Sequence, residues 1–224
     1  MPTRPRAAIS WSGGKDCCLA LMRVWRDYDV CTAITMFDDA GARSRSHGLR
    51  PDVLTGQADR LGLSTIIEPC SWETYTDAFA RALVRAKAIG CTHVIFGDIF
   101  EDAHLAWTEA RCRDAGFTAV QPLWGEPTHA LVREFIDRGG DARLTTVRQP
   151  MLDATWLGRQ LTHAAVDELT ALGADPCGER GEYHSVVVHC PLFSSPLVLT
   201  PGEIVERGGC WAVDFVPEAA HAPR

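Results

Sequence analysis

The sequence has 224 residues, of which 46% are hydrophobic and 23% are charged, the balance of an ordinary soluble globular protein. This length favours one large domain, or one domain with a smaller second unit. The formal net charge of −7 argues against a broad surface for nucleic acid or anionic membranes, although it leaves room for one local basic patch. No apolar run approaches the roughly 20 residues that span a bilayer, and no signal-like stretch precedes Ser12, so we expect a cytoplasmic protein.

Nine cysteines are many for such a protein. Their number is odd and no two have Cys-x-x-Cys spacing, so the zinc-site patterns do not match. Most lie at apolar positions of periodic segments, where cysteine behaves as a small hydrophobic residue. We therefore expect reduced cysteines in the core, and set apart only Cys17 and Cys177, which lie inside motifs.

Strand and helix signals alternate through the first 122 residues. Strands are predicted over residues 7–11, 30–37, 63–67, 93–96 and 118–121. Helices are predicted over residues 16–26, 51–61, 72–89 and 102–115. The alternation predicts an α/β unit, residues 1–122, with a mostly parallel sheet and helices on both faces. Such sheets bind ligands beyond the C-terminal ends of their strands.

The pattern changes after residue 122. A helix over 128–138, a strand over 142–148 and a long helix over 153–172 are followed by the Gly-rich, acidic segment 175–185. Short strands are then predicted over 186–189, 197–199 and 212–216. This half is interpreted as a smaller α+β domain over 123–217, with a disordered tail over 218–224.

The strongest local signal is Ser12-Gly13-Gly14-Lys15-Asp16, between a predicted strand and a predicted helix. Glycines let the backbone approach a ligand closely, a helix N-terminus favours an anion, and lysine adds a positive charge. The usual P-loop is excluded because position 9 is Ile and position 16 is Asp, and the segment is not G-x-G-x-x-G. A plain Gly-Gly turn with a solvated lysine is the alternative, but the strand–turn–helix context favours phosphate.

The run SGGKDC also resembles the SGG-x-D-S signature of the PP-loop ATP pyrophosphatases. That resemblance implies a doubly wound five-stranded sheet and cleavage of ATP between its α- and β-phosphates. The sequence departs from the signature at Cys17, where the superfamily usually has serine. If that hydroxyl contacts phosphate, the contact is weakened here; if the side chain only packs, nothing is lost.

Further motifs narrow the resemblance to the diphthine–ammonia ligase family. They are Gly97-Asp98-Ile99-Phe100, Glu109, Pro122-Leu123-Trp124, Leu152-Asp153, Leu157-Gly158-Arg159, Asp175-Pro176-Cys177-Gly178-Glu179 and Gly181-Glu182-Tyr183-His184-Ser185. They stand in the family's order between residues 9 and 195. Leu105 is a departure, because family members often carry arginine near this position.

The resemblance implies ATP-dependent amidation of a carboxylate through an acyl-adenylate, with ATP, Mg²⁺ and ammonia. Implied ATP-binding residues are Ser12, Gly13, Gly14, Lys15, Asp16, Cys17, Gly97 and Asp98, with Asp16 as the magnesium candidate. Implied catalytic residues are Lys15, Asp16 and Glu182. Implied substrate-binding residues are Asp153, Arg159, Gly178, Glu179, Gly181, Glu182 and His184. The acceptor is either a diphthine-bearing elongation factor or another small molecule; no membrane or nucleic acid is expected, and a homo-oligomer is compatible with the sequence.

Several segments keep two interpretations. The segment 178–185 is either a substrate loop or a Gly-rich turn with solvated acids. The loop around His47, with Arg43, Arg45 and Arg50 near it, is either a mobile polar loop or a lid over ATP. The seven tryptophans fit core packing better than a stacking platform.

Two other function classes also stay open. One is a PP-loop ATPase acting on another small molecule or on tRNA, which the acidic charge disfavours. The other is a non-catalytic adenine-nucleotide-binding protein, which Cys17 and Leu105 keep open.

Overall fold

The computed structural model describes residues 4–218, so nearly all of the tail predicted over 218–224 lies outside the described residues. The first half folds as a five-stranded parallel sheet in the order β3-β2-β1-β4-β5. Its strands are β1 (Arg6–Ser10), β2 (Asp29–Phe37), β3 (Ser64–Pro69), β4 (His93–Ile95) and β5 (Thr118–Val120). Its helices are α1 (Lys15–Val24), α2 (Pro51–Leu61), α3 (Tyr75–Ala88) and α4 (Asp102–Asp114). The doubly wound α/β arrangement expected from the sequence is thus confirmed.

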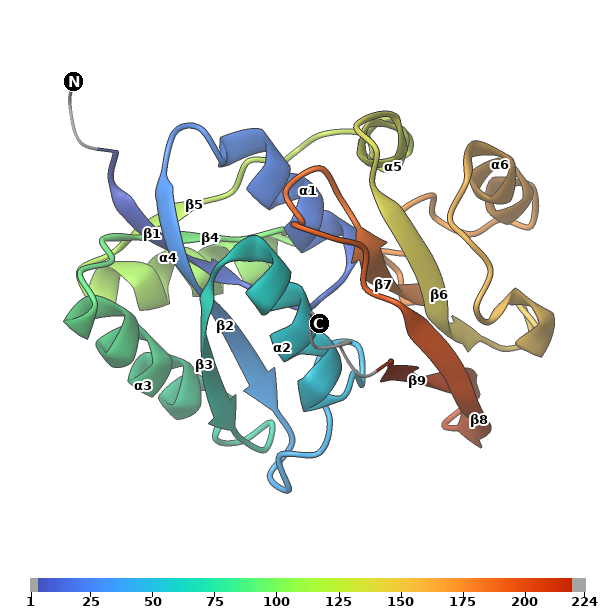
Figure 1. Ribbon diagram of the computed structural model, residues 1–224, viewed down its shortest axis with the longest axis horizontal. Coiled ribbons are helices and arrows are strands. Elements are labelled where there is room, and N and C mark those ends of the chain that lie inside the picture. Colours follow the sequence, from blue (N-terminus) through green and yellow to red (C-terminus); the bar gives the residue numbers. More distant parts are fainter. Residues whose placement is uncertain (1–3, 219–224) are drawn as a thin grey trace, which may run out of the picture.

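Each face of this sheet carries its own buried core. Successive side chains of a strand point to opposite faces. Ala7 and Ile9 therefore pack with α1 and α2, whereas Ala8 packs with α3 and Cys112 of α4. Because β1 and β4 are parallel neighbours, the loops that follow them lie at the same edge of the sheet. The two helix layers flank this edge (Figure 1).

The second half folds around a four-stranded antiparallel sheet in the order β7-β6-β9-β8. Its elements are α5 (Thr128–Asp137), β6 (Asp141–Arg148), the short 3₁₀ helix η1 (Ala154–Trp156), α6 (His163–Ala171), β7 (Tyr183–His189), β8 (Leu199–Arg207) and β9 (Cys210–Pro217). Figure 1 shows this sheet on the side of the parallel sheet that carries α1 and α2. The buried side chains of α1, α5, β6 and β7 form one continuous cluster, so the two units share a core.

The long helix predicted over 153–172 is wrong. Leu161 N–H donates to the Ala142 carbonyl at 2.9 Å and Gly158 N–H donates to the Leu144 carbonyl at 2.8 Å, so this stretch pairs with β6. A new helix, α6, begins after Thr162, whose side chain accepts a hydrogen bond from Ala165 N–H. Tertiary pairing with β6 thus overrides the helical periodicity of the sequence.

Two further elements differ from the prediction. The helix predicted from residue 72 begins at Tyr75, because Ser71 and Thr74 bond each other in a turn that leaves Trp72 67% exposed. β8 and β9 are longer than predicted and form a hairpin through Gly208 and Gly209, both with positive φ.

All nine cysteines lie within the described residues and are free, seven of them buried, as the sequence predicts. Among residues 4–218, no helix has the length and apolar character needed to cross a membrane.

Candidate functional site

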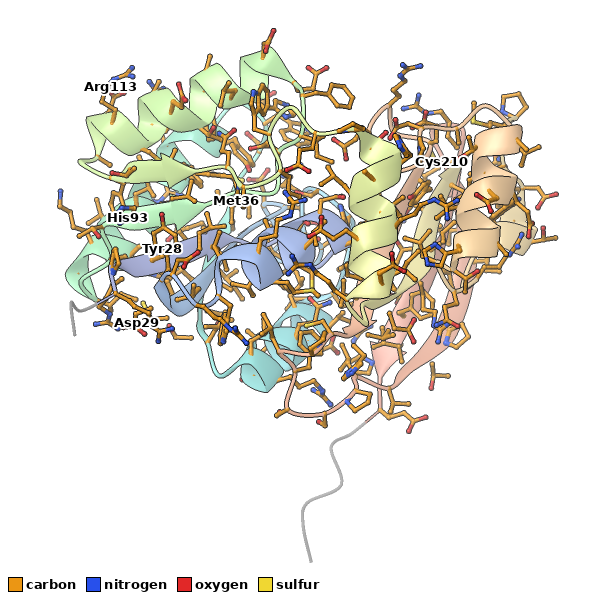
Figure 2. The ribbon with its side chains drawn as sticks, turned by 90° about the horizontal axis from the view of Figure 1, so that it is seen from above. Tyr28, Asp29, Met36, His93, Arg113 and Cys210 are labelled. Carbon is orange, nitrogen blue, oxygen red and sulfur yellow. The ribbon has the colours of Figure 1, made fainter. Side chains whose placement is uncertain are left out.

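The loops that follow β1 and β4 meet at the carboxyl edge of the parallel sheet. The strand order reverses between these two strands, which opens a crevice there. A cavity of about 680 Å³ occupies this crevice, a volume typical of small-molecule sites. Met36, near the end of β2, lines the cavity and is labelled near the middle of Figure 2. Residues from the segment 177–185 of the second unit line it as well.

The SGGKD loop is shaped by close approaches of neighbouring segments. Gly13 has a φ of +82°, which residues with a side chain rarely adopt. Its carbonyl accepts hydrogen bonds from Gln57 Nε2 at 3.0 Å and from Val187 N–H at 2.9 Å. A Cβ on Gly97 would lie 2.7 Å from the Cys17 nitrogen, so only glycine lets the β4 loop rest on α1. The first turn of α1 therefore faces the cavity at the point where a helix favours an anion.

Lys15 is a buried charge at the junction of the two units, with 3% of its surface exposed. Its Nζ donates to Asp16 Oδ2 at 2.8 Å and to the Cys177 carbonyl, and lies 5.2 Å from the centre of the Tyr183 ring. Burial opposes the charge, but Asp16 and Tyr183 hold the pKa of Lys15 well above its ordinary value. The lysine is a fixed positive charge rather than the mobile side chain of a solvated turn.

The two departures from the family pattern lie in different surroundings. Cys17 is buried; its thiol donates to the Gly14 carbonyl at 3.2 Å and accepts from Ser12 Oγ at 3.3 Å. Burial raises the pKa of Cys17, so the thiol packs and does not act as a reactive thiolate. Leu105 is half-buried on α4 and does not line the cavity, but the preceding residue, His104, does.

Three carboxylates, those of Asp16, Asp98 and Glu179, line the same cavity. Burial raises the pKa of Asp98. Burial, and then the charge of Asp16, raise the pKa of Glu179 to about 8. Among residues 4–218, no group of three or more His, Cys, Asp or Glu side chains could hold a metal ion. Mg²⁺ needs only one or two carboxylates when phosphates and water complete its shell, so these carboxylates fit an ion that arrives with a nucleotide.

The loop before β7 brings Glu179, not Glu182, to the cavity wall. Glu182 is buried and accepts backbone hydrogen bonds from Asp175 at 2.9 Å and from Arg180 at 3.0 Å. Its carboxylate thus fixes the shape of the loop, and Gly178 and Gly181 complete the turn with positive φ. The sequence could not separate the two glutamates, because they stand three positions apart in one glycine-rich turn.

His47 and His184 stack with ring centroids 4.7 Å apart. His47 Nδ1 lies 2.9 Å from the Ser185 carbonyl, which identifies this nitrogen as the donor. The ring of His47 also fills the space that a side chain on Gly14 would occupy. Burial lowers the pKa of His47 to about 4 and that of His184 to about 3, so both rings are neutral near pH 7. The loop of residues 38–50 is therefore packed against the SGGKD loop through His47.

An aromatic wall faces the carboxylates. Trp72 stacks on Tyr75 at 5.7 Å, Tyr75 contacts Trp107 at 5.6 Å, and Trp107 contacts Phe79 at 5.1 Å. These rings run from the exposed mouth into the interior and all line the cavity. The interpretation that the tryptophans fit core packing better than a stacking platform is wrong for Trp72 and Trp107, which both line the cavity. Trp72 and Trp107 stand 35 positions apart, and only the docking of α4 beside α3 joins them.

Asp153 and Arg159 lie outside the cavity lining. Asp153 caps η1 by accepting from Thr155 N–H at 2.9 Å. The Arg159 guanidinium stacks 3.9 Å from the centre of the Trp156 ring and donates to Glu168 at 2.8 Å. Both side chains hold the segment that crosses from β6 to α6.

Two family models match this chain, one after the other. The diphthamide synthase N-terminal domain matches residues 5–119, and the diphthamide synthase C-terminal domain matches residues 127–214. The chain belongs to the diphthamide synthase family.

The curated relatives carry the name that the sequence motifs indicate. Diphthine–ammonia ligase of Schizosaccharomyces pombe is 34% identical over 100 residues, which are 43% of this chain and 16% of that protein. The human diphthine–ammonia ligase is 27% identical over 113 residues, which are 49% of this chain and 42% of that protein. This chain therefore matches less than half the length of either family member.

Among solved structures, a predicted subunit of a tRNA methyltransferase from Methanocaldococcus jannaschii is similar. It is 15% identical, with a TM-score of 0.43, and the match covers 84% of this chain and 98% of that one.

Proposed function

We propose that this chain binds ATP in the cavity and uses it to convert a carboxylate into an amide. The observation that carries the proposal is the placement of the SGGKD loop and Asp98 on either side of the strand-order reversal, in a chain of the diphthamide synthase family. The loop offers backbone N–H groups and the buried charge of Lys15 to phosphates. The β2 end would give the adenine an apolar surface, and the aromatic wall would give one to the acceptor.

The chemistry takes two steps. A carboxylate oxygen of the acceptor attacks the α-phosphorus, the bond to the β-phosphate oxygen breaks, and pyrophosphate leaves. Ammonia then attacks the acyl carbon, the bond to AMP breaks, and the nitrogen loses a proton. The chain's part is positioning and charge neutralisation, because adenylation itself supplies the good leaving group that a carboxylate lacks.

Asp16 is the residue that would hold Mg²⁺, which would neutralise phosphate charge. The crowding of carboxylates around it favours this role, since burial and the charge of Asp16 raise the pKa of Glu179. A cation beside them relieves that repulsion.

Proton removal from the ammonium nitrogen needs a base near neutral pH. Glu179, with a pKa of about 8, lines the cavity and suits this role, whereas His184 lines it with a pKa of about 3 and is too weak a base. Glu182 is assigned a positioning role in the same loop, because its carboxylate is occupied by backbone N–H groups.

For the acceptor we propose a carboxylate-bearing molecule that enters past Trp72. By family membership this is diphthine on an elongation factor, and a small carboxylic acid is the alternative acceptor. Ammonia is the proposed nitrogen donor, and the cytoplasm the proposed compartment.

Incubation of the protein with ATP, Mg²⁺, ammonium and each candidate acceptor tests the proposal by separation of the nucleotide products. AMP with pyrophosphate, formed only when an acceptor is present, is the expected result. ADP with phosphate would contradict it. ATP binding without turnover on any acceptor would favour a nucleotide-binding role alone.

A further inference from the structure

Two cysteines meet at the edge of the parallel sheet that lies opposite the cavity. The Sγ atoms of Cys31 and Cys91 are 3.2 Å apart, although the residues are 60 positions apart in the chain. Cys31 lies near the beginning of β2, and Cys91 lies in the turn between α3 and β4. Figure 2 shows the neighbouring residues Asp29 and His93, the first residues of β2 and β4, at one end of the molecule. Met36, which lines the cavity, lies nearer its middle.

A β-bulge brings Cys31 to this contact. β1 separates β2 from β4 in the sheet, so an ordinary ladder would keep the two thiols apart. Ala7 pairs with Val30 and Ala8 with Thr32, which leaves Cys31 as the extra residue without a partner on β1. Bulges re-aim side chains, and here the thiol of Cys31 lies over the Ala7 carbonyl at 3.6 Å and reaches Cys91.

Both backbones are fixed where the thiols meet. Ser64 Oγ on β3 donates to the Cys31 carbonyl at 3.0 Å. Cys91 N–H donates to the Ala86 carbonyl at 3.1 Å, and Thr92 N–H next to it donates to the Arg6 carbonyl at 2.9 Å. The contact therefore belongs to the folded sheet and is not a meeting of two mobile side chains.

We infer that Cys31 and Cys91 are an oxidation site, at which hydrogen peroxide converts the two thiols into one disulfide bond. The conversion takes two reactions, and each of them is balanced. The Cys31 sulfur attacks the peroxide, the O–O bond breaks, and sulfenic acid and one water form. The Cys91 thiol then attacks the sulfenic sulfur, the S–O bond breaks, the S–S bond forms, and a second water leaves. The peroxide gains the two electrons that the two sulfurs lose.

The surroundings give the two cysteines different roles. Cys31 is partly exposed and open to the oxidant, whereas Cys91 is buried. Burial, and then the hydrogen bond shared with Cys31, raise the pKa of Cys91 to about 12, which keeps it a thiol until the neighbouring sulfur is oxidised. Arg6 and Asp29 form an ion pair nearby, with 3.5 Å between Nε and Oδ2, and their charges act on the pKa of Cys91 in opposite directions.

The protein contains two internal controls. Cys18 and Cys190 form a second neighbouring pair, but both are fully buried and shielded from an oxidant in solution. Cys210 is partly exposed on the β8–β9 hairpin and reports the oxidation of a thiol outside either pair.

The test treats the folded chain with hydrogen peroxide, alkylates the remaining thiols, and maps the peptides without reduction. We expect a link between Cys31 and Cys91 with the loss of two hydrogens, reversed by dithiothreitol, while Cys18 and Cys190 stay alkylated. Free Cys31 and Cys91 after Cys210 has been oxidised would overturn the inference. So would a link formed only between two molecules.

A second measurement uses the melting temperature. A bond that closes a 60-residue loop should raise the Tm of the oxidised chain by about 5–10 °C. The Cys31→Ser variant should show no rise, and the Cys210→Ser variant should keep it. An equal rise in the Cys31→Ser variant would overturn the assignment. ATP affinity should change less than twofold, because the cavity lies at the other end of the strands.

Discussion

The two halves of the molecule contribute to the cavity in different ways. The parallel half supplies the SGGKD loop, the β4 loop and the aromatic wall, all from segments that follow the ends of strands. The antiparallel half supplies the glycine-rich loop before β7 and the first residues of β7. The first half therefore has the architecture that binds nucleotides in doubly wound folds, and the second half closes it from one side.

Contacts between the two halves position the side chains of the candidate site. Lys15 belongs to the first half, but its Nζ and its backbone N–H both bond the second half, at the Cys177 carbonyl and at Ser185 Oγ. Gln57 bonds the carbonyls of both Gly13 and Val187. The site is thus a junction, and variants on either side of it separate the contributions of the two halves.

The largest effect is expected at the junction lysine. Lys15→Met should lower ATP turnover by at least about 100-fold, because it removes a fixed charge beside the phosphates. Product formation measured by nucleotide chromatography checks this, and circular dichroism checks the fold. The matched control is Lys87→Met, an exposed lysine whose Nζ donates to the Ala115 carbonyl and lies 5.9 Å from the centre of the Phe117 ring, away from the cavity. Equal turnover in the two variants would contradict the assignment of the SGGKD loop to the ATP site.

A smaller effect is expected on the aromatic wall of the first half. Trp72→Ala should raise the KM for the acceptor about fivefold, because one stacked aromatic face contributes about 1 kcal/mol. ATP affinity should be unchanged, since Trp72 is at the mouth. Val84→Ala, an equally exposed apolar residue of α3, is the control. A loss of ATP affinity in Trp72→Ala alone would instead place the nucleotide base against this wall.

The glutamate of the second half should appear as a pH effect on stability. The pKa of Glu179 is raised to about 8, so between about pH 4.5 and pH 8 the folded chain binds more protons than the unfolded chain. Its free energy of unfolding therefore falls as the pH rises through this window. The Glu179→Gln variant has no carboxyl to ionise and so does not lose this stability. The Tm of the variant minus that of the wild type should therefore increase by at least about 2 °C from pH 5 to pH 8. The control is Glu109→Gln at an exposed position, for which the difference in Tm from the wild type should stay constant over this pH range. A constant difference for Glu179→Gln would contradict the prediction.

The smallest effect is expected away from the junction. Arg159→Ala should leave kcat and KM within twofold and cost about 1 kcal/mol or less of stability, because it removes one surface ion pair and one cation–π contact. Urea denaturation and acceptor titration measure the two quantities. A tenfold rise in the KM for the acceptor would contradict this prediction. It would place Arg159 in the acceptor site and add a second segment of the antiparallel half to that site.

Much of the parallel half could be predicted from sequence, because its elements are short, periodic and separated by turn residues. α2 (Pro51–Leu61) agrees with the prediction at both ends, since a proline begins it and a glycine with φ of +70° ends it. The segment after β6 could not be predicted, because its leucine spacing suits a helix while its backbone pairs with a strand.

The candidate site shows the same limit residue by residue. The SGGKD loop could be recognised because its residues are adjacent, between a strand and a helix. For the loop around His47 the sequence left two interpretations open. Trp72 and Trp107 lie on separate segments, and no local pattern connects them to the cavity. Glu179 and Glu182 have the same residue type in one turn, and only burial and hydrogen bonds assign one to the wall and the other to the scaffold.

The sequence by itself determined the alternating α/β order, the position of the SGGKD loop between a strand and a helix, and the family, because these depend on residues close together in the chain. The tertiary structure alone decided that Lys15 is buried, that Asp153 and Arg159 lie off the cavity, and that Cys31 meets Cys91. Each of these depends on contacts between segments that are distant in sequence, where packing and hydrogen bonding across the two sheets outweigh local preference.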